Sequence, residues 1–151
     1  MKKIENSSLT AEQRKLVDEA IKIRQKSYSP YSNFKVGAAL YSISGQLHTG
    51  CNIESADYTL SSHAEMVAID QMVKSGELQI KELAVCFQSN SIAVPCGLCR
   101  QKMVEFSNDA DISIICVSLD SEDNINGLYQ TKLSILLPNS FSKNDLIIEE
   151  A

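Results

Sequence analysis

The segment HAEMVAIDQMVKSG at residues 63–76 is followed by LAVCF at 83–87, PCGLCRQKMVEFS at 95–107 and DISIICVSL at 111–119. The first and third segments are typical of helices, whereas the second and fourth are short and dense in apolar or β-branched residues, as strands are. Strands that alternate with helices need crossover connections. This half of the chain therefore predicts a parallel pair of strands covered by helices.

The part of the chain before residue 63 predicts a helix and a hairpin. Residues 10–13 form the pattern of a capping box, and the helix that they open is expected to end before Pro30. A strand is predicted over 34–43 and an antiparallel partner over 46–53, with Gly45 in the turn between them.

A short fifth strand is predicted near 128–132, ahead of a C-terminal segment. Together the elements predict an α/β fold, with one mixed five-stranded sheet flanked by helices. The chain shows no linker or internal repeat, so a single domain is expected over 1–151.

Composition excludes several classes of protein. The chain has 151 residues, of which 44% are hydrophobic and 22% charged, and no apolar run reaches the roughly 20 residues of a membrane span. The segment 1–6 lacks the apolar stretch of a secretory signal, so a cytoplasmic location is expected. The net charge of -5 disfavours a nucleic-acid partner, because gripping a phosphate backbone needs a basic surface.

Three side chains lie at the starts of the two predicted helices. Cys96 and Cys99 are one helical turn apart directly after Pro95, and His63 begins the other helix. Unpaired amides at a helix start favour thiolates. If the two helix starts meet at one edge of the sheet, one imidazole and two thiolates can bind Zn²⁺ and leave a fourth position for water. The sequence therefore predicts an open zinc site.

Glu65 lies two residues after His63 and completes the pattern. A carboxylate beside an open zinc site, but not bound to it, can take a proton from water and deliver it to a substrate. The order H-x-E…P-C-x-x-C resembles the signature of zinc-dependent nucleobase deaminases. Glu65 is therefore the expected catalytic residue and zinc the expected cofactor.

Beyond this signature, the chain resembles the cytidine deaminases of the short, single-domain type. The resemblance covers nearly the whole chain and rests on motifs at 28–40, 50–56, 95–101 and 136–141. It implies the three-layer α/β/α fold of that family. It also implies hydrolytic deamination of cytidine or 2′-deoxycytidine in pyrimidine salvage, with a free nucleoside as the binding partner.

The same resemblance implies roles for residues outside the metal motif. Asn52 and Glu54 would bind the ribose 3′-hydroxyl, Phe34 would pack against the pyrimidine ring, and backbone groups of Ala64 would hold the base edge. Further positions resemble family residues that reach the site of a neighbouring subunit, namely Ala56, Tyr58 and Phe141. They imply a homo-oligomer, with a tetramer favoured over a dimer.

Two positions depart from the family pattern. Short-type members usually have Cys at the position of His63 and Arg at the position of Met66. Three thiolates on zinc leave a net negative charge that an Arg can neutralise, whereas one imidazole and two thiolates leave none. We therefore interpret the two replacements as linked by charge. Asp57 and the pair Ser61-Ser62 also differ from common family choices and leave the substrate open.

Three other functions stay open at this point. The substrate could be a modified cytidine or an aminopyrimidine nucleoside antibiotic, handled by a deaminase or an amidohydrolase. An editor of polynucleotides is disfavoured by the negative charge. A zinc-stabilised binding module without activity would need a fourth protein ligand, for which His48 and Cys51 are the candidates.

Overall fold

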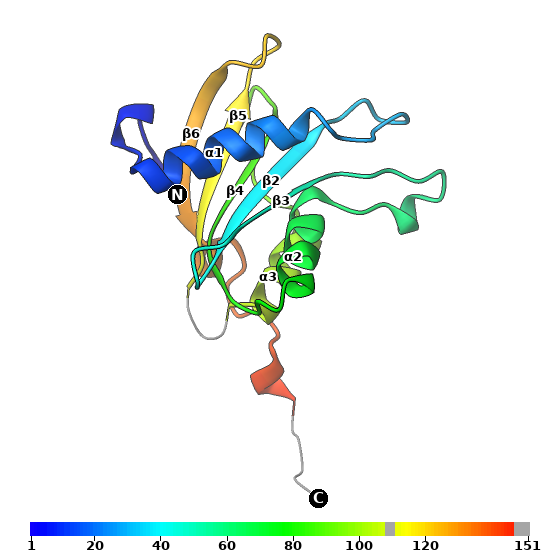
Figure 1. The fold of residues 1–151 in the computed structure, drawn as a ribbon, viewed down its shortest axis with the longest axis vertical. Helices are drawn as coiled ribbons and strands as arrows, with labels where there is room; N and C mark the ends of the chain where they lie inside the picture. Colours follow the sequence, from blue (N-terminus) through cyan, green and yellow to red (C-terminus); the bar gives the residue numbers. More distant parts are fainter. Residues whose placement is uncertain (108–110, 147–151) are drawn as a thin grey trace, which may run out of the picture.

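The computed structural model describes residues 1–107 and 111–146, and in these residues a single mixed sheet has six strands (Figure 1). The strands are Lys2–Lys3 (β1), Val36–Ser42 (β2), Leu47–Cys51 (β3), Ile80–Gln88 (β4), Ser113–Leu119 (β5) and Ile125–Lys132 (β6). Their order across the sheet is β1-β6-β5-β4-β2-β3. β4 and β5 are parallel, as predicted, and the other neighbouring strands are antiparallel.

Helices cover both faces of this sheet. The α-helices are Ala11–Arg24 (α1), Ala64–Lys74 (α2), Gly97–Glu105 (α3) and Leu133–Leu136 (α4). Short 3-10 helices span Asn6–Ser8 (η1), Tyr58–Leu60 (η2) and Lys143–Asp145 (η3). α1 lies across the strands on one face, and α2 and α3 lie side by side on the other (Figure 1). Among the described helices, none combines the length and the apolar character that a membrane span needs.

The sheet residues divide between two cores. Ala39 and Ile115 point to the α1 side and pack with Leu16 and Val17. On the other face, residues of β2, β4 and β5 pack with α2 and α3, where Ile69 is one of the fully buried side chains. Because β2, β4 and β5 each have one face buried under α1 and the other under α2 and α3, their sequences are mostly apolar.

The predicted helix boundaries have the expected local causes. Thr10 accepts a hydrogen bond from the Gln13 amide, and the Gln13 side chain accepts one from the Thr10 amide, both at 3.2 Å. This capping box satisfies two amides that the first turn of α1 leaves unpaired. Gly76 follows α2 with φ +90°, and Gly45 has φ +88° in the turn between β2 and β3, a backbone conformation that favours glycine.

The sheet has one strand more than the five predicted. The additional strand, β1, pairs Lys2 with Gln130 and Lys3 with Tyr129, and two residues are too few to show an alternating pattern. β2 begins at Val36 rather than at residue 34, because the chain before it makes a turn in which Asn33 has φ +55°. The three-layer α/β/α architecture is confirmed.

The topology brings one edge of the sheet to the starts of two helices. Val36 at the start of β2 pairs with Phe87 near the end of β4. The chain then leads from β4 into α3, which begins after Cys96, while α2 begins after His63. The starts of α2 and α3 therefore lie close together beyond the end of β4.

Gly50 lets α2 lie directly on β3. A Cβ atom at this position would be 2.3 Å from the carbonyl oxygen of Ala64 and 2.4 Å from the amide nitrogen of Ala68. Gly50→Ala must push the helix backbone away, and we expect it to lower the free energy of unfolding by about 3 kcal/mol or more. Denaturant unfolding measures the loss. Gly97→Ala is the matched control, because a Cβ there has no heavy atom within 4 Å, and equal stability of the two variants would contradict the prediction.

Candidate active site

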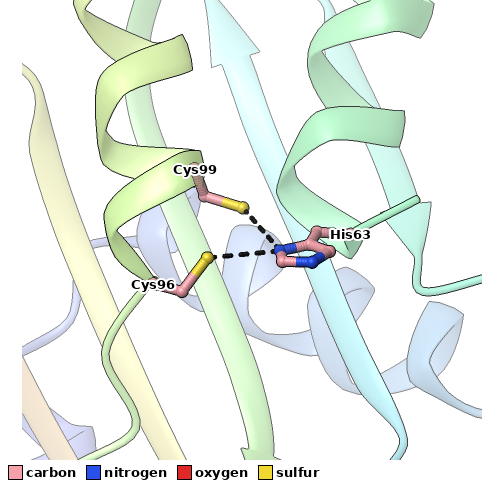
Figure 2. A group of neighbouring side chains, drawn as sticks. All are labelled: His63, Cys96 and Cys99. Atoms are coloured by element: carbon pink, nitrogen blue, oxygen red, sulfur yellow. Dashed lines mark hydrogen bonds between the residues drawn. The ribbon is translucent and has the colours of Figure 1, made fainter. Parts of the chain in front are cut away.

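Three potential metal ligands meet between the starts of α2 and α3. His63 is the N-cap of α2, Cys96 is the N-cap of α3, and Cys99 lies in the first turn of α3. Figure 2 shows the two sulfur atoms pointing toward the same imidazole nitrogen. Nδ1 of His63 is 3.2 Å from the Cys96 sulfur and 3.4 Å from the Cys99 sulfur, and the three ligand atoms lie within 4.8 Å of one another.

These separations fit a tetrahedral zinc ion. Zinc binds sulfur at about 2.3 Å and imidazole nitrogen at about 2.0 Å, so two ligands of a tetrahedral site are about 3.5 Å apart. In the described part of the chain the cluster contains no fourth His, Cys, Asp or Glu. His48 and Cys51, on the neighbouring strand β3, are not members of it. Three protein ligands leave one position open to solvent, which is typical of a catalytic zinc site.

The protein around these ligands favours a bound cation. Cys99 is fully buried, and burial followed by the charges of Glu65 and Cys96 raises the pKa of its thiol well above the usual range. A metal ion would reverse this balance, because its charge stabilises the thiolate that burial disfavours. The partial positive charge at the starts of α2 and α3 acts in the same direction.

Glu65 is buried beside the metal ligands in the first turn of α2. Glu65 is 4% exposed, and its burial raises the pKa of its carboxyl group. Hydrogen bonds from its own backbone and from the Cys99 side chain oppose that shift. A carboxyl group with a raised pKa can hold a proton near neutral pH and release it, as a general acid and base must.

An open cavity of about 520 Å³ lies in front of this cluster. It is lined by Ser32, Phe34, Val36, Asn52, Glu54, Tyr58, Ser61, Ser62, His63, Ala64, Glu65, Phe87, Val94 and Cys96. The volume is within the range that small-molecule sites occupy in proteins. Five of the seven predicted substrate residues line it, among them Tyr58, which was predicted to reach the site of a neighbouring subunit. The other two do not: Ala56 is exposed, and Phe141 is 61% exposed with its carbonyl bonded to the Gln101 side chain.

The two polar residues predicted to bind a ribose both line the cavity. The Glu54 carboxylate accepts hydrogen bonds from the amides of Tyr31 and Ser32 and from the Ser32 hydroxyl. The Ser32 hydroxyl is the main cause of a lowered pKa of Glu54, so this carboxylate is charged near neutral pH. Asn52 uses its side-chain amide to hold the chain around Phe34 and Val36.

Sequence reasoning missed Phe87, which lines the cavity. Its ring centroid is 5.1 Å from that of Phe34, at an interplanar angle of 54°, so the two rings form one aromatic wall. An available signal was its place at the carboxyl end of a predicted strand, just before the loop that leads to Cys96. Val94, in that loop, also lines the cavity, and no motif in the sequence around it pointed to this position.

Residues 10–116 match the family model described as "Cytidine and deoxycytidylate deaminase zinc-binding region". The chain belongs to this deaminase family. The match includes all three residues of the metal cluster, and zinc is the cofactor of this region.

Individual relatives extend the deaminase match over most of the chain. The cytidine deaminase of Sporosarcina psychrophila is 38% identical over 87% of this chain and 93% of its own length. That of Halalkalibacterium halodurans is 35% identical over 87% of this chain and 95% of its own. The crystal structure of cytidine deaminase from Burkholderia pseudomallei has a TM-score of 0.78 and 32% identity, covering 88% of this chain and 100% of that one.

Proposed function

We propose that this protein is a zinc-dependent hydrolase that converts cytidine or 2′-deoxycytidine, with water, into the corresponding uracil nucleoside and ammonia. The observation that carries the proposal is the buried Glu65 beside an open cluster of His63, Cys96 and Cys99 at the bottom of a nucleoside-sized cavity. Membership of the deaminase family and relatives named cytidine deaminase support the same activity.

The chemistry follows from the groups around the cavity. A zinc ion held by the cluster would supply a Lewis acid that makes water nucleophilic at neutral pH. Glu65 protonates N3 of the cytosine ring, which makes C4 electrophilic, and accepts the proton that water gives up on attack. It then delivers this proton to the departing amine and accepts the remaining proton of the C4 hydroxyl as the carbonyl forms, so that ammonia leaves, the uracil base remains and Glu65 is again protonated. The backbone of Ala64, next to Glu65, holds the base edge.

The remaining cavity residues orient the nucleoside. We assign the binding of the ribose 3′-hydroxyl to the polar side chains of Asn52 and Glu54. The apolar side chain of Phe34 would pack against the face of the pyrimidine ring. Glu54 is already held by two backbone amides, so its carboxylate can accept a hydroxyl donor without first being ordered.

A screen of free nucleosides for ammonia release tests the activity. We expect the purified zinc-loaded protein to release one ammonia for each cytidine or 2′-deoxycytidine consumed, with no reaction on adenosine. The screen includes N4-modified and 5-substituted cytidines and a single-stranded DNA oligonucleotide. Activity restricted to a modified nucleoside or to the oligonucleotide would replace the proposed substrate, and no ammonia from any of them would refute the enzyme.

We propose further that the active form is a homo-oligomer, a tetramer rather than a dimer. Tyr58 at the cavity mouth is 73% exposed, Leu60 beside it is 70% exposed, and Phe141 is 61% exposed. Large apolar side chains that are this exposed favour a partner surface that covers them. A neighbouring subunit would cover them and bring its own Phe141 and Ala56 near the site. Sedimentation equilibrium measures the oligomeric state, and we expect the mass of a tetramer.

A further inference from the structure

The chain that carries Phe34 into the cavity has no regular secondary structure between α1 and β2. Asn33 adopts φ +55°, its amide donates to the carbonyl of Ser29, and the amide of Phe34 donates to the Ser32 hydroxyl. The Phe34 side chain itself is 45% exposed and touches the ring of Phe87. Local bonds of this kind shape a turn but do not fix its direction relative to the sheet, so the position of Phe34 depends on contacts from elsewhere.

Asn52 provides the contacts on one side. Its Nδ2 donates to the carbonyl of Phe34 at 2.8 Å, and its Oδ1 accepts from the amide of Val36 at 2.8 Å. The carbonyl of Lys35 belongs to the same peptide group as the Val36 amide. Because the peptide bond is trans, this carbonyl points away from Asn52, and a different residue holds it.

That residue is Arg24, the last residue of α1. It is 4% exposed, and its Nε donates to the carbonyl of Lys35 at 3.1 Å. The approach is possible because α1 lies directly on β2 at Gly37, where a Cβ would be 2.1 Å from the carbonyl of Ala20 and 2.8 Å from the Cβ of Arg24.

Asp123, in the turn between β5 and β6, holds Arg24 from its far end. Nη1 of Arg24 donates to Oδ1 of Asp123 at 2.7 Å, and the side chain of Gln25 donates to Oδ2 at 2.9 Å. Asp120 in the same turn accepts hydrogen bonds from the amides of Glu122 and Asn124, which orders the turn. A guanidinium group bound at both ends in this way has a fixed position, because its donors are planar and rigid.

We propose that Arg24 is a positioning residue for the substrate, which fixes the direction of Phe34 through the carbonyl of Lys35 and is itself oriented by Asp123. The inference rests on the proposed function only in the identity of the ligand, a pyrimidine nucleoside. Phe34 contacts the face of the ring rather than the reacting atoms. If Phe34 loses its position, the enzyme therefore binds the substrate and the transition state more weakly by the same factor. KM then rises and kcat stays nearly unchanged.

The first test measures cytidine kinetics of Arg24→Gln. We expect KM to rise about tenfold and kcat to change by less than about threefold. Arg14→Gln is the matched control, because Arg14 lies on the same helix and makes two hydrogen bonds, both to Asn6. Asp123→Asn is a second variant at a half-exposed residue and should raise KM in the same direction. An unchanged KM in both Arg24→Gln and Asp123→Asn overturns the proposal.

Coupling to Phe34 separates positioning from a general loss of structure. In a Phe34→Ala background, Arg24→Gln should raise KM by less than about twofold, because the side chain that it positions is already gone. If Arg24 only supports the fold, its effect on KM persists in full in that background. The proposal is therefore contradicted if the rise in KM of the double variant equals the product of the rises in the two single variants.

Hydrogen exchange supplies a readout without turnover. We expect amides in segment 28–36 to exchange faster in Arg24→Gln and Asp123→Asn than in the unmodified protein, whereas those of α2 keep their protection. Unchanged exchange in 28–36 would overturn the inference even if the enzyme acts on cytidine. Faster exchange in a protein that turns over no nucleoside would instead count against the proposed function alone.

Discussion

Glu65→Gln abolishes turnover of cytidine and leaves about one zinc ion per chain. The amide keeps the shape of the side chain but can neither accept the proton from water nor deliver one to N3 and to the amine. General acid–base catalysis is worth roughly 10²–10⁴ in rate for a single group, and Glu65 serves several transfers, so kcat falls by about 10⁴ or more. Ammonia release measures the rate, and mass spectrometry of the metal measures zinc.

Two controls make this result specific. Glu105→Gln removes an exposed carboxylate from α3 and should retain full activity with the same zinc content. Substantial turnover by Glu65→Gln would exclude Glu65 as the proton carrier. Loss of zinc together with activity would make it a ligand or a support of the site instead.

Stability gives a further check on Glu65. Because burial raises the pKa of its carboxyl group, the folded protein favours the protonated form. Its contribution to stability is therefore present below the pKa of the unfolded chain and lost as pH rises through the folded pKa. In the metal-free protein, Glu65→Gln avoids the buried charge and should be at least as stable as the unmodified protein at pH 7, by denaturant unfolding.

Cys99→Ala removes both zinc and activity. Cys99 is fully buried and supplies one of three ligands, so its loss leaves two ligands and an incomplete site. We expect zinc content below about a tenth of an ion per chain after dialysis and no measurable turnover. Zinc added back should restore the chelator-treated unmodified protein but not the variant, and full zinc occupancy in Cys99→Ala would contradict the assignment.

Cys86→Ala is the matched control for this substitution. Cys86 is also fully buried, but its thiol lies on the α1 side of the sheet and donates to the carbonyl of Ala20. Burial raises the pKa of Cys86 to about 12, so it stays protonated near neutral pH. The variant should keep its zinc and its activity, which shows that the loss in Cys99→Ala comes from the metal site and not from a missing buried thiol.

The metal cluster could be predicted from the sequence because each member is tied to a local signal. Cys96 and Cys99 are fixed in relation to one another by the helix that they open, and His63 is fixed by the start of another. Only the meeting of the two helix starts was a global assumption, and the structure brings the three side chains together there. The order of the main elements follows from equally local patterns.

Other features depend on contacts between segments far apart in the chain. Arg24 reads as one of several charged residues on a solvated helix, and nothing near it in the sequence points to Asp123 in a turn 99 residues later. Phe87 reads as an ordinary strand residue until its strand is placed beside the loop that carries Phe34. The short β1 has no pattern at all, because pairing with β6 alone makes it a strand.

The glycine turns at Gly45 and Gly76 lie at the ends of strands and helices that point away from the cavity. At both glycines no heavy atom lies within 4 Å of the position that a Cβ would take, and both have a positive φ. Exposed tips of this kind are where chains best accept inserted residues. A reporter peptide or an attachment point for a solid support can therefore be placed at these turns, at the opposite end of α2 and of β2 from the zinc ligands, without entering the path of the nucleoside.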